Sequence, residues 1–236
     1  MITAIIVAAG RGMRFAEAQR NKEIPPKQFL HLGGIPLYIH SVKALSVIPD
    51  VDSIIIVTAG DYICAVKEQV ASFRLTKVVE IVAGGDERQD SVWNGLQMLP
   101  CDTEIVLVHD GARPFPPMEA TRRAITLART HGAAILAQPT TDTVKITPEG
   151  VSEGDPLLPI ETTLTRTRVW RAQTPQVFQR HLILHAYEFI RERGLTITDE
   201  AQAVEVYGKK VFIVPSPGTN MKITTPRDLE TAERML

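Results

Sequence analysis

The chain has 236 residues, of which 44% are hydrophobic and 22% charged, enough for one α/β domain with a buried core. Its 26 Lys and Arg against 27 Asp and Glu give a formal net charge of -1, so no overall basic field would recruit nucleic acid or an anionic membrane. No apolar run approaches the roughly 20 residues of a membrane span, and the start lacks the basic segment of a signal peptide. With only two cysteines, the sequence predicts a cytoplasmic protein that binds neither nucleic acid nor membrane.

Short apolar runs rich in β-branched residues predict the strands. They are uninterrupted by polar alternation, which is typical of strands buried on both faces. In chain order the predicted strands are Ala4–Ala9, Ser53–Thr58, Val78–Val82, Glu104–Val108, Ala133–Ala137 and Lys210–Val214.

Segments of helical period lie between these strands. One helix is predicted over Met118–His131 with Gly132 as its C-cap, and another has an apolar face and ends at Gly194. That face consists of Leu182, Ile183, Ala186 and Ile190. The last helix begins at Thr225 as N-cap, with Pro226 in its first turn and Asp228 three residues after the cap.

The alternation of strands and helices favours an α/β doubly wound, mostly parallel sheet with right-handed crossovers. One stretch departs from it: Thr, Pro and Gly dominate Pro139–Pro159, with a short alternating run at 143–147. We interpret this stretch as an inserted β-arm at about 139–160 within a single domain of residues 1–236.

The loop after the first strand has the composition of an anion site. Ala8, Ala9, Gly10 and Gly12 let backbone N–H groups approach a phosphate closely, and Arg14 adds a cation. The third glycine of a dinucleotide fingerprint and the G-K-[S/T] of a P-loop are both absent. By itself the loop leaves nucleotide binding and a tight structural turn equally open.

Seven blocks in order along the chain resemble the cytidylyltransferases that act on small polyol phosphates. They are Ala8-Ala9-Gly10-x-Gly12-x-Arg14 with Pro26-Lys27-Gln28, 84–92, 109–114, 142–143, 173–176, 197–201 and 220–224. The run Ile197–Ala201 favours the branch acting on 2-C-methyl-D-erythritol 4-phosphate, in the non-mevalonate isoprenoid pathway, over the ribitol 5-phosphate branch.

The resemblance implies a Rossmann-like fold of the nucleotidyltransferase type, a homodimer joined through the β-arm with shared active sites, and a requirement for Mg²⁺. It implies that CTP and the polyol phosphate give the CDP-polyol and pyrophosphate. The alternatives are a ribitol-5-phosphate cytidylyltransferase and, in another class, a catalytically dead nucleotide-binding protein.

Residue by residue, the resemblance assigns catalytic functions to four cations. Arg14 and Lys27 would stabilise the transition state, Lys222 would hold the reacting phosphates, and Arg166 would position the attacking phosphate. Arg168 is the alternative to Arg166. Such a reaction depends on positioning and electrostatics, because a phosphate monoester is already a nucleophile at neutral pH.

The remaining candidates are binding residues. For CTP they are Ala8, Ala9, Gly10, Gly12, Gly85, Asp86, Ser91, Asp110 and Gly111, with the 84–86 turn and Ser91 reading the base. For the polyol phosphate they are Arg113, Thr143, Thr174 and Thr198.

Three points of this assignment remain open. Asp110, after a buried strand, is interpreted as a ligand of Mg²⁺ or of a hydroxyl. The alternative is a loop residue whose side chain caps the next turn. Lys27 stands thirteen positions after Arg14, more than the family's usual spacing, so Lys22 is a rival for the function of Lys27. Gly111 stands where the family more often has alanine. His109 is expected to be a core residue.

Overall fold

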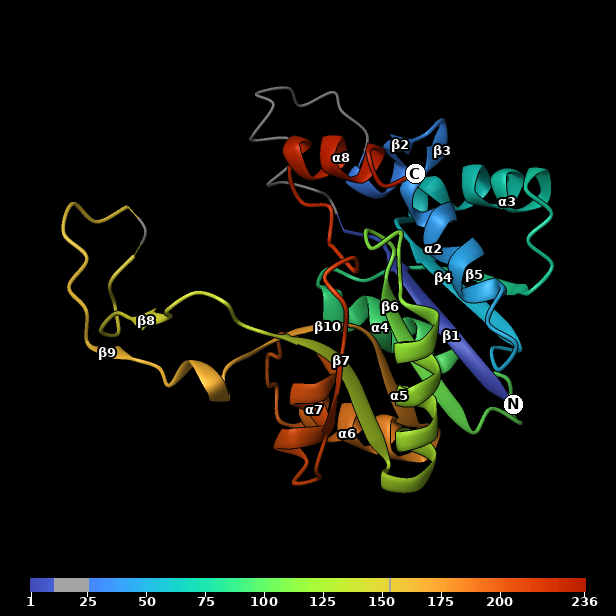
Figure 1. Cartoon of the computed structure of the whole chain (residues 1–236). Coiled ribbons are helices and arrows are strands. Elements are labelled where there is room, and N and C mark those ends of the chain that lie inside the picture. The colour runs from blue at the N-terminus through green and yellow to red at the C-terminus, as the bar shows by residue number, and fades with distance from the viewer. Residues whose placement is uncertain (11–25, 153) are drawn as a thin grey trace.

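The computed structural model describes residues 1–10, 26–152 and 154–236, and of Lys27 the backbone alone. A seven-stranded sheet in the order β11-β7-β10-β6-β1-β4-β5 runs through the molecule (Figure 1). Its strands are β1 (Ile2–Ala8), β4 (Ser53–Thr58), β5 (Val78–Ala83), β6 (Ile105–Asp110), β7 (Ala133–Pro139), β10 (Trp170–Gln179) and β11 (Phe212–Pro215). All six predicted strands are present, each within about two residues of its predicted ends.

The sheet is mostly parallel, as predicted. β1 is parallel to β4 and β6, β4 to β5, and β7 to β11. The exception is β10, which runs antiparallel between β6 and β7 and was not predicted.

Helices cover both faces of the sheet, so the predicted doubly wound α/β class is confirmed (Figure 1). Along β1, Ala4 and Ile6 point into one core and Ile5 into the other, as the period of two requires. The first core includes α2 (Leu37–Ser46), α3 (Ile63–Ser72) and α5 (Met118–His131), and the second includes α4 (Arg88–Gln97), α6 (Arg180–Glu192) and α7 (Glu200–Val206).

The two edge strands contradict one expectation. Neither β5 nor β11 is buried on both faces: Val79 is 54% exposed, and Phe212 and Ile213 are exposed as well. The reason is their position, since an outermost strand has a neighbour on one side only.

Local signals placed the helix ends well. Helix α5 spans the predicted residues and ends at Gly132, whose φ of 96° requires glycine. Helix α6 ends at Glu192, just before Gly194 with φ 61°. Helix α8 (Pro226–Glu233) begins with a capping box between Thr225 and Asp228 and packs against the hairpin β2 (His31–Leu32) and β3 (Ile35–Pro36).

The chain between β7 and β10 forms an arm that projects from the sheet (Figure 1). It contains the two-residue strands β8 (Lys145–Ile146) and β9 (Thr162–Thr163), which pair antiparallel, and the 3-10 helix η3 (Arg166–Arg168). The predicted range of 139–160 is therefore too short at its carboxyl end, because β9 lies beyond it. No described helix is long and apolar enough to cross a membrane.

Candidate active site

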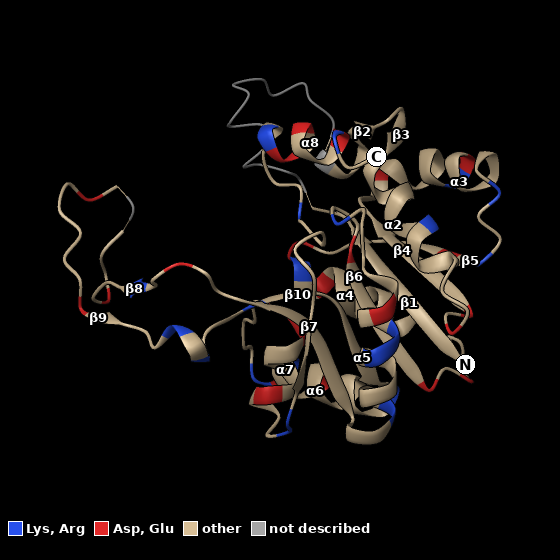
Figure 2. Ribbon diagram, viewed as in Figure 1, with Lys and Arg blue, Asp and Glu red and all other residues tan. Residues whose placement is uncertain are grey.

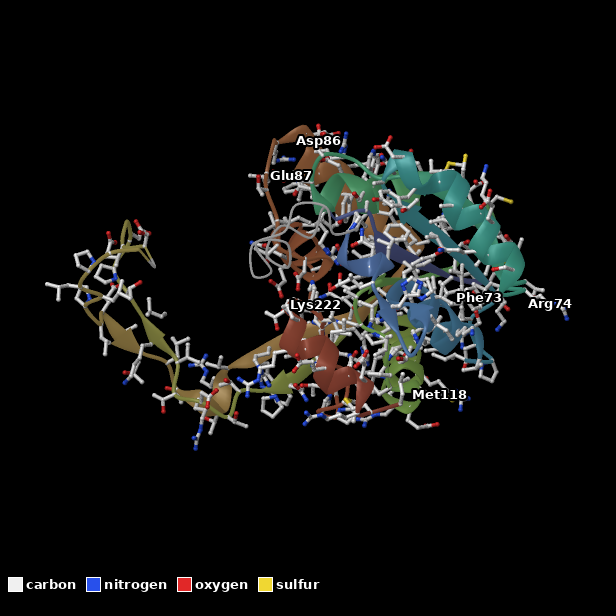
Figure 3. All side chains as sticks on the ribbon, turned by 90° about the horizontal axis from the view of Figure 1, so that it is seen from above. Phe73, Arg74, Asp86, Glu87, Met118 and Lys222 are labelled. Atoms are coloured by element: carbon white, nitrogen blue, oxygen red, sulfur yellow. The ribbon has the colours of Figure 1, made fainter. Side chains whose placement is uncertain are left out.

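The candidate site lies at the carboxyl ends of the parallel strands, where open α/β sheets bind ligands. The segments after β1, β5 and β6 meet at this end. Figure 3 views the molecule from above Figure 1, with Lys222 near the middle and the side chains of Asp86 and Glu87 at one side. Over the described chain, Lys and Arg are interspersed with Asp and Glu (Figure 2), so a binding site for anions must be local.

Asp110 forms the centre of such a local cluster. It is the last residue of β6 and only 7% exposed. Its Oδ1 lies 3.1 Å from Nη2 of Arg88, and its Oδ2 lies 2.7 Å from Nζ of Lys222 and 3.6 Å from Nε of Arg113. One carboxylate thus gathers three cations from three separate parts of the chain.

The charge state of this cluster follows from its contacts. Burial by itself would raise the pKa of Asp110, but Arg88, Lys222 and Arg113 outweigh it and hold the pKa well below the usual range. Burial lowers the pKa of the neighbouring His109 to about 4, so this imidazole is neutral at pH 7. The cluster presents cations and no protonated histidine to a ligand.

Hydrogen bonds fix the backbone of Asp110 through Thr174 and His109. The N–H of Asp110 donates to Oγ1 of Thr174 at 3.0 Å, and that hydroxyl lies 3.0 Å from Nδ1 of His109. Nε2 of His109 lies 3.0 Å from the carbonyl oxygen of Arg113, an acceptor, so Nε2 carries the proton and Nδ1 accepts from Thr174. Both groups therefore orient the 109–113 turn, which confirms His109 as a core residue.

Asn220 connects Arg113 and Lys222 to β10. Its side-chain NH₂ group donates to the main-chain carbonyl oxygen of Thr174 at 2.9 Å, and its main-chain carbonyl oxygen accepts from Nη1 of Arg113 at 2.8 Å. Lys222 follows two residues later. The predicted residues Asp110, Arg113, Thr174 and Lys222 are thus brought together from three distant blocks.

Sequence reasoning missed two members of the cluster, Arg88 and Glu200. Arg88 bridges the two carboxylates of Asp110 and Glu200. Both residues stand inside the family blocks, at the first positions of α4 and α7. That placement was the available signal, although nothing in the sequence pairs residues 112 positions apart.

The loop after β1 is described up to Gly10. Gln28 is buried, and its amide donates to the carbonyl oxygens of Ala8 and Gly10 at 2.6 and 2.8 Å. This holds the 3-10 helix η1 (Lys27–Phe29) against the end of β1. Gly12, Arg14 and the rival Lys22 lie outside the described residues.

The predicted base-reading turn lies beside Ala9. Oγ of Ser91 accepts from the N–H of Gly85 and donates to the carbonyl oxygen of Glu87, both at 3.1 Å. Ser91 therefore shapes the turn from inside, while Asp86 is exposed. A side chain at position 84 would overlap the methyl group of Ala9.

That close approach gives a first prediction. Gly84→Ala should lower the free energy of unfolding by about 1–3 kcal/mol, as overpacking does, because its Cβ would lie 2.7 Å from Oγ of Ser91. Urea unfolding measures the loss. The matched control is Gly60→Ala, just after the neighbouring strand β4, where a Cβ meets no heavy atom within 4 Å. Equal stability of the two variants would contradict the prediction.

Gly111 lies in a tight place too. A Cβ there would lie 3.2 Å from the Cβ of Ala8 and 3.2 Å from the carbonyl oxygen of Val7. The N–H of Gly111 donates to that same carbonyl oxygen at 2.9 Å. The glycine therefore lets the ends of β1 and β6 approach closely.

Three predicted residues are not brought to Asp110 in this chain. Arg166 and Thr143 are exposed on the arm, where Nη1 of Arg166 donates to the carbonyl oxygen of Thr141. Thr198 is exposed, and its hydroxyl donates to Oε1 of Gln202 at 3.0 Å beside the N-cap Asp199 of α7. Within one subunit these residues contact other groups.

The described residues include no group of three or more His, Cys, Asp or Glu that could hold a metal ion. Asp110 is the carboxylate at the centre of the cation cluster, and Mg²⁺ in nucleotide sites typically takes one or two carboxylates plus substrate phosphates. The residues present therefore fit an ion held mainly by a bound triphosphate, with Asp110 as a protein ligand.

Comparison with known proteins places this chain in a family. The family model described as 2-C-methyl-D-erythritol 4-phosphate cytidylyltransferase, IspD, matches residues 2–236. The enzyme of that name from Syntrophus aciditrophicus is 41% identical over 236 residues, covering 100% of this chain and 95% of that protein. A bifunctional enzyme IspD/IspF from Desulforudis audaxviator is 42% identical over 234 residues, but the chain spans only 56% of its length.

A solved structure agrees with these sequence matches. The 4-diphosphocytidyl-2C-methyl-D-erythritol synthase from Anaerococcus prevotii superposes with a TM-score of 0.84 at 30% identity, covering 100% of this chain and 95% of that one.

Proposed function

The chain belongs to the 2-C-methyl-D-erythritol 4-phosphate cytidylyltransferase family, and we propose that it transfers the cytidylyl group of CTP to 2-C-methyl-D-erythritol 4-phosphate. A phosphate oxygen of the acceptor attacks the α-phosphorus of CTP in line. The bond from that phosphorus to the oxygen bridging to the β-phosphate breaks. The products are 4-diphosphocytidyl-2-C-methyl-D-erythritol and pyrophosphate, which keeps the bridging oxygen and its electron pair.

The observation that carries this proposal is the gathering of Arg88, Arg113 and Lys222 around the buried Asp110. The reaction brings one anion to another, so it needs fixed cations more than a base. The acceptor phosphate has a second pKa of about 6 and is largely dianionic at neutral pH. The neutral His109, with both ring nitrogens hydrogen-bonded, suits a reaction without a histidine base.

We assign the cations as follows. Lys222 and Arg113 face the reacting phosphates, while Arg14 and Lys27 stabilise charge as pyrophosphate leaves. The loop after β1 holds the triphosphate with its backbone N–H groups. The turn at Gly85 and Asp86, shaped by Ser91, reads the cytosine by hydrogen bonds, which discriminate strongly because a wrong base leaves polar groups unpaired.

Mg²⁺ belongs to the same proposal. The triphosphate would supply most of its ligands and Asp110 one more. When bound, the ion neutralises charge on the phosphates. Asp110 also holds Lys222 in place at 2.7 Å.

We further propose a homodimer in which the arm of one subunit completes the other subunit's site. The arm supports this in two ways. It carries Arg166 and Thr143 on a segment that projects from the sheet (Figure 1), and it exposes Leu157, at 82%, and Ile160, at 61%. Exposed apolar residues on a projecting segment are typical of an interface.

Mixing two inactive variants tests this sharing. Arg166→Ala and Lys27→Ala proteins should regain activity when their subunits exchange, because each heterodimer contains one site with both residues intact. With random exchange half of the dimers are mixed, so about a quarter of wild-type activity should return. If subunit exchange is verified by mass and no activity returns, each site is built from one chain.

The function itself is tested by pyrophosphate release with CTP and Mg²⁺, offering 2-C-methyl-D-erythritol 4-phosphate and ribitol 5-phosphate in parallel. We expect turnover with the first alone. Turnover with ribitol 5-phosphate alone would replace the acceptor while keeping the reaction. Binding of CTP without turnover on either would indicate a catalytically dead protein.

We place the enzyme in the cytoplasm. Its two cysteines, Cys64 and Cys101, are both free and exposed, which suits a reducing compartment.

A further inference from the structure

Glu200 is a buried charge for which the proposed reaction has no direct use. It is the first residue of α7 and is 0% exposed. Its Oε1 and Oε2 accept from Nη1 and Nη2 of Arg88 at 2.5 and 3.1 Å, and the hydroxyl of Tyr187 donates to Oε1 at 3.3 Å. Burying a carboxylate costs free energy unless it is paired. The two hydrogen bonds from Arg88 to Glu200 provide that pairing.

The Nε edge of the Arg88 guanidinium binds Asp110. Its Nε and Nη2 donate to Oδ1 of Asp110 at 3.3 and 3.1 Å. A guanidinium has five N–H groups in a rigid fork, and four of them are used between the two carboxylates. Arg88 is therefore committed to the protein and has at most one N–H left for a ligand.

Because of these bonds to Arg88, the two oxygens of Asp110 have different partners. Oδ1 accepts both bonds from Arg88, whereas Oδ2 faces Lys222 at 2.7 Å and Arg113 at 3.6 Å. The rotation of the carboxylate is set by its bonds to Arg88, and Oδ2 is the oxygen presented to Lys222 and Arg113.

We propose that Glu200 is a positioning residue for the cytidylyl transfer, acting through Arg88 to fix the Asp110 carboxylate so that Oδ2 holds Lys222 in place. This inference rests on the proposed function of the site. Glu200 is 0% exposed and therefore offers no surface to a substrate, and it lies 112 residues from Arg88 in the sequence.

The consequence of losing Glu200 follows from hydrogen-bond types. In Glu200→Gln one oxygen becomes an NH₂ group, which would face an N–H of Arg88, donor against donor. Arg88 then loses its forked partner and can rotate away from Oδ1 of Asp110. Since small displacements of catalytic groups are costly, kcat should fall about tenfold.

A double-mutant cycle separates positioning from a general structural effect. Glu200→Gln should lower kcat about tenfold in the wild-type background but less than about twofold when Asp110→Asn is already present, because there is no longer a carboxylate to fix. Equal factors in the two backgrounds would overturn the proposal, since a merely structural loss acts regardless of Asp110.

The matched control is Glu205→Gln, the same change at an exposed position of the same helix, which should leave kcat unchanged. A tenfold loss there, or none in Glu200→Gln, would also overturn the proposal. If Glu200→Gln does not fold, Arg88→Lys carries the same cycle, because lysine keeps the charge but cannot bridge two carboxylates. Wild-type turnover distinguishes the outcomes: without it the proposed function fails, whereas with it only the positioning function is at stake.

Discussion

Replacing Asp110 by asparagine is expected to lower kcat for pyrophosphate release by about 10²–10³-fold, the range for loss of one preorganised electrostatic group. The amide has nearly the same shape but no charge. Lys222 and Arg113 therefore lose the carboxylate oxygen that lies 2.7 and 3.6 Å from them. The three cations of the cluster then repel one another at the place where their positions matter.

The same substitution should lower the free energy of unfolding by about 2–3 kcal/mol, less than the 3–5 of a fully buried pair. The expected loss is smaller because the side chains of Arg88 and Lys222 are 31% and 36% exposed, so that water screens their attraction to Asp110. Urea unfolding measures this loss and initial rates measure kcat.

Asp50→Asn is the matched control for Asp110→Asn. Asp50 makes a similar contact with Arg122, 2.8 Å from its Nε, but at the surface. Its loss should destabilise the protein far less than Asp110→Asn does and leave kcat unchanged. If Asp110→Asn behaved like Asp50→Asn, the cluster around Asp110 would be a surface-like ion pair without a catalytic function.

The fold was predictable where the local sequence decides the structure. Ser53–Thr58 is an apolar β-branched run and became β4 without change of ends. Thr225 and Asp228 close a capping box within four residues, so the start of α8 needs no information from elsewhere in the chain.

Strand β10 shows where local reasoning fails. Its ten residues include three glutamines, an arginine and a proline, so no apolar run or clean alternation marks it. Its polar side chains bond to groups from other elements: the Gln176 amide, for example, donates to Oδ2 of Asp199 at 2.9 Å. Tertiary partners thus stabilise this strand, and sequence periodicity cannot show them.

The site divides in the same way. Asp110 was predictable because it ends a buried strand, and Lys222 because its block resembles the family's. That one carboxylate joins Arg88, Arg113 and Lys222 depends on how three distant segments pack. Glu200 was missed for the same physical reason, since its partners are fixed by the fold and not by spacing.

Substitution of Lys27 by alanine is the other change from which we expect a large effect, a loss of about 10²-fold or more in kcat. Gln28 is buried, and its amide is held at 2.6 Å by the carbonyl oxygen of Ala8. The backbone of Lys27 therefore lies beside the end of β1, where helix and loop N–H groups would hold the triphosphate. A cation supplied from this position would act where negative charge grows on the leaving pyrophosphate.

Lys22→Ala is the natural comparison, because the long spacing after Arg14 makes Lys22 the rival. Measured at saturating CTP and acceptor, kcat should change less than about threefold in Lys22→Ala, since this substitution removes the same charge from a different point of the segment. A large loss in Lys22→Ala with near-normal turnover in Lys27→Ala would assign the function to Lys22 instead. In that case the hydrogen bonds from Gln28 to Ala8 and Gly10 would serve to shape the loop after β1. They would not serve to position a catalytic cation, because Lys27 would be dispensable for charge stabilisation.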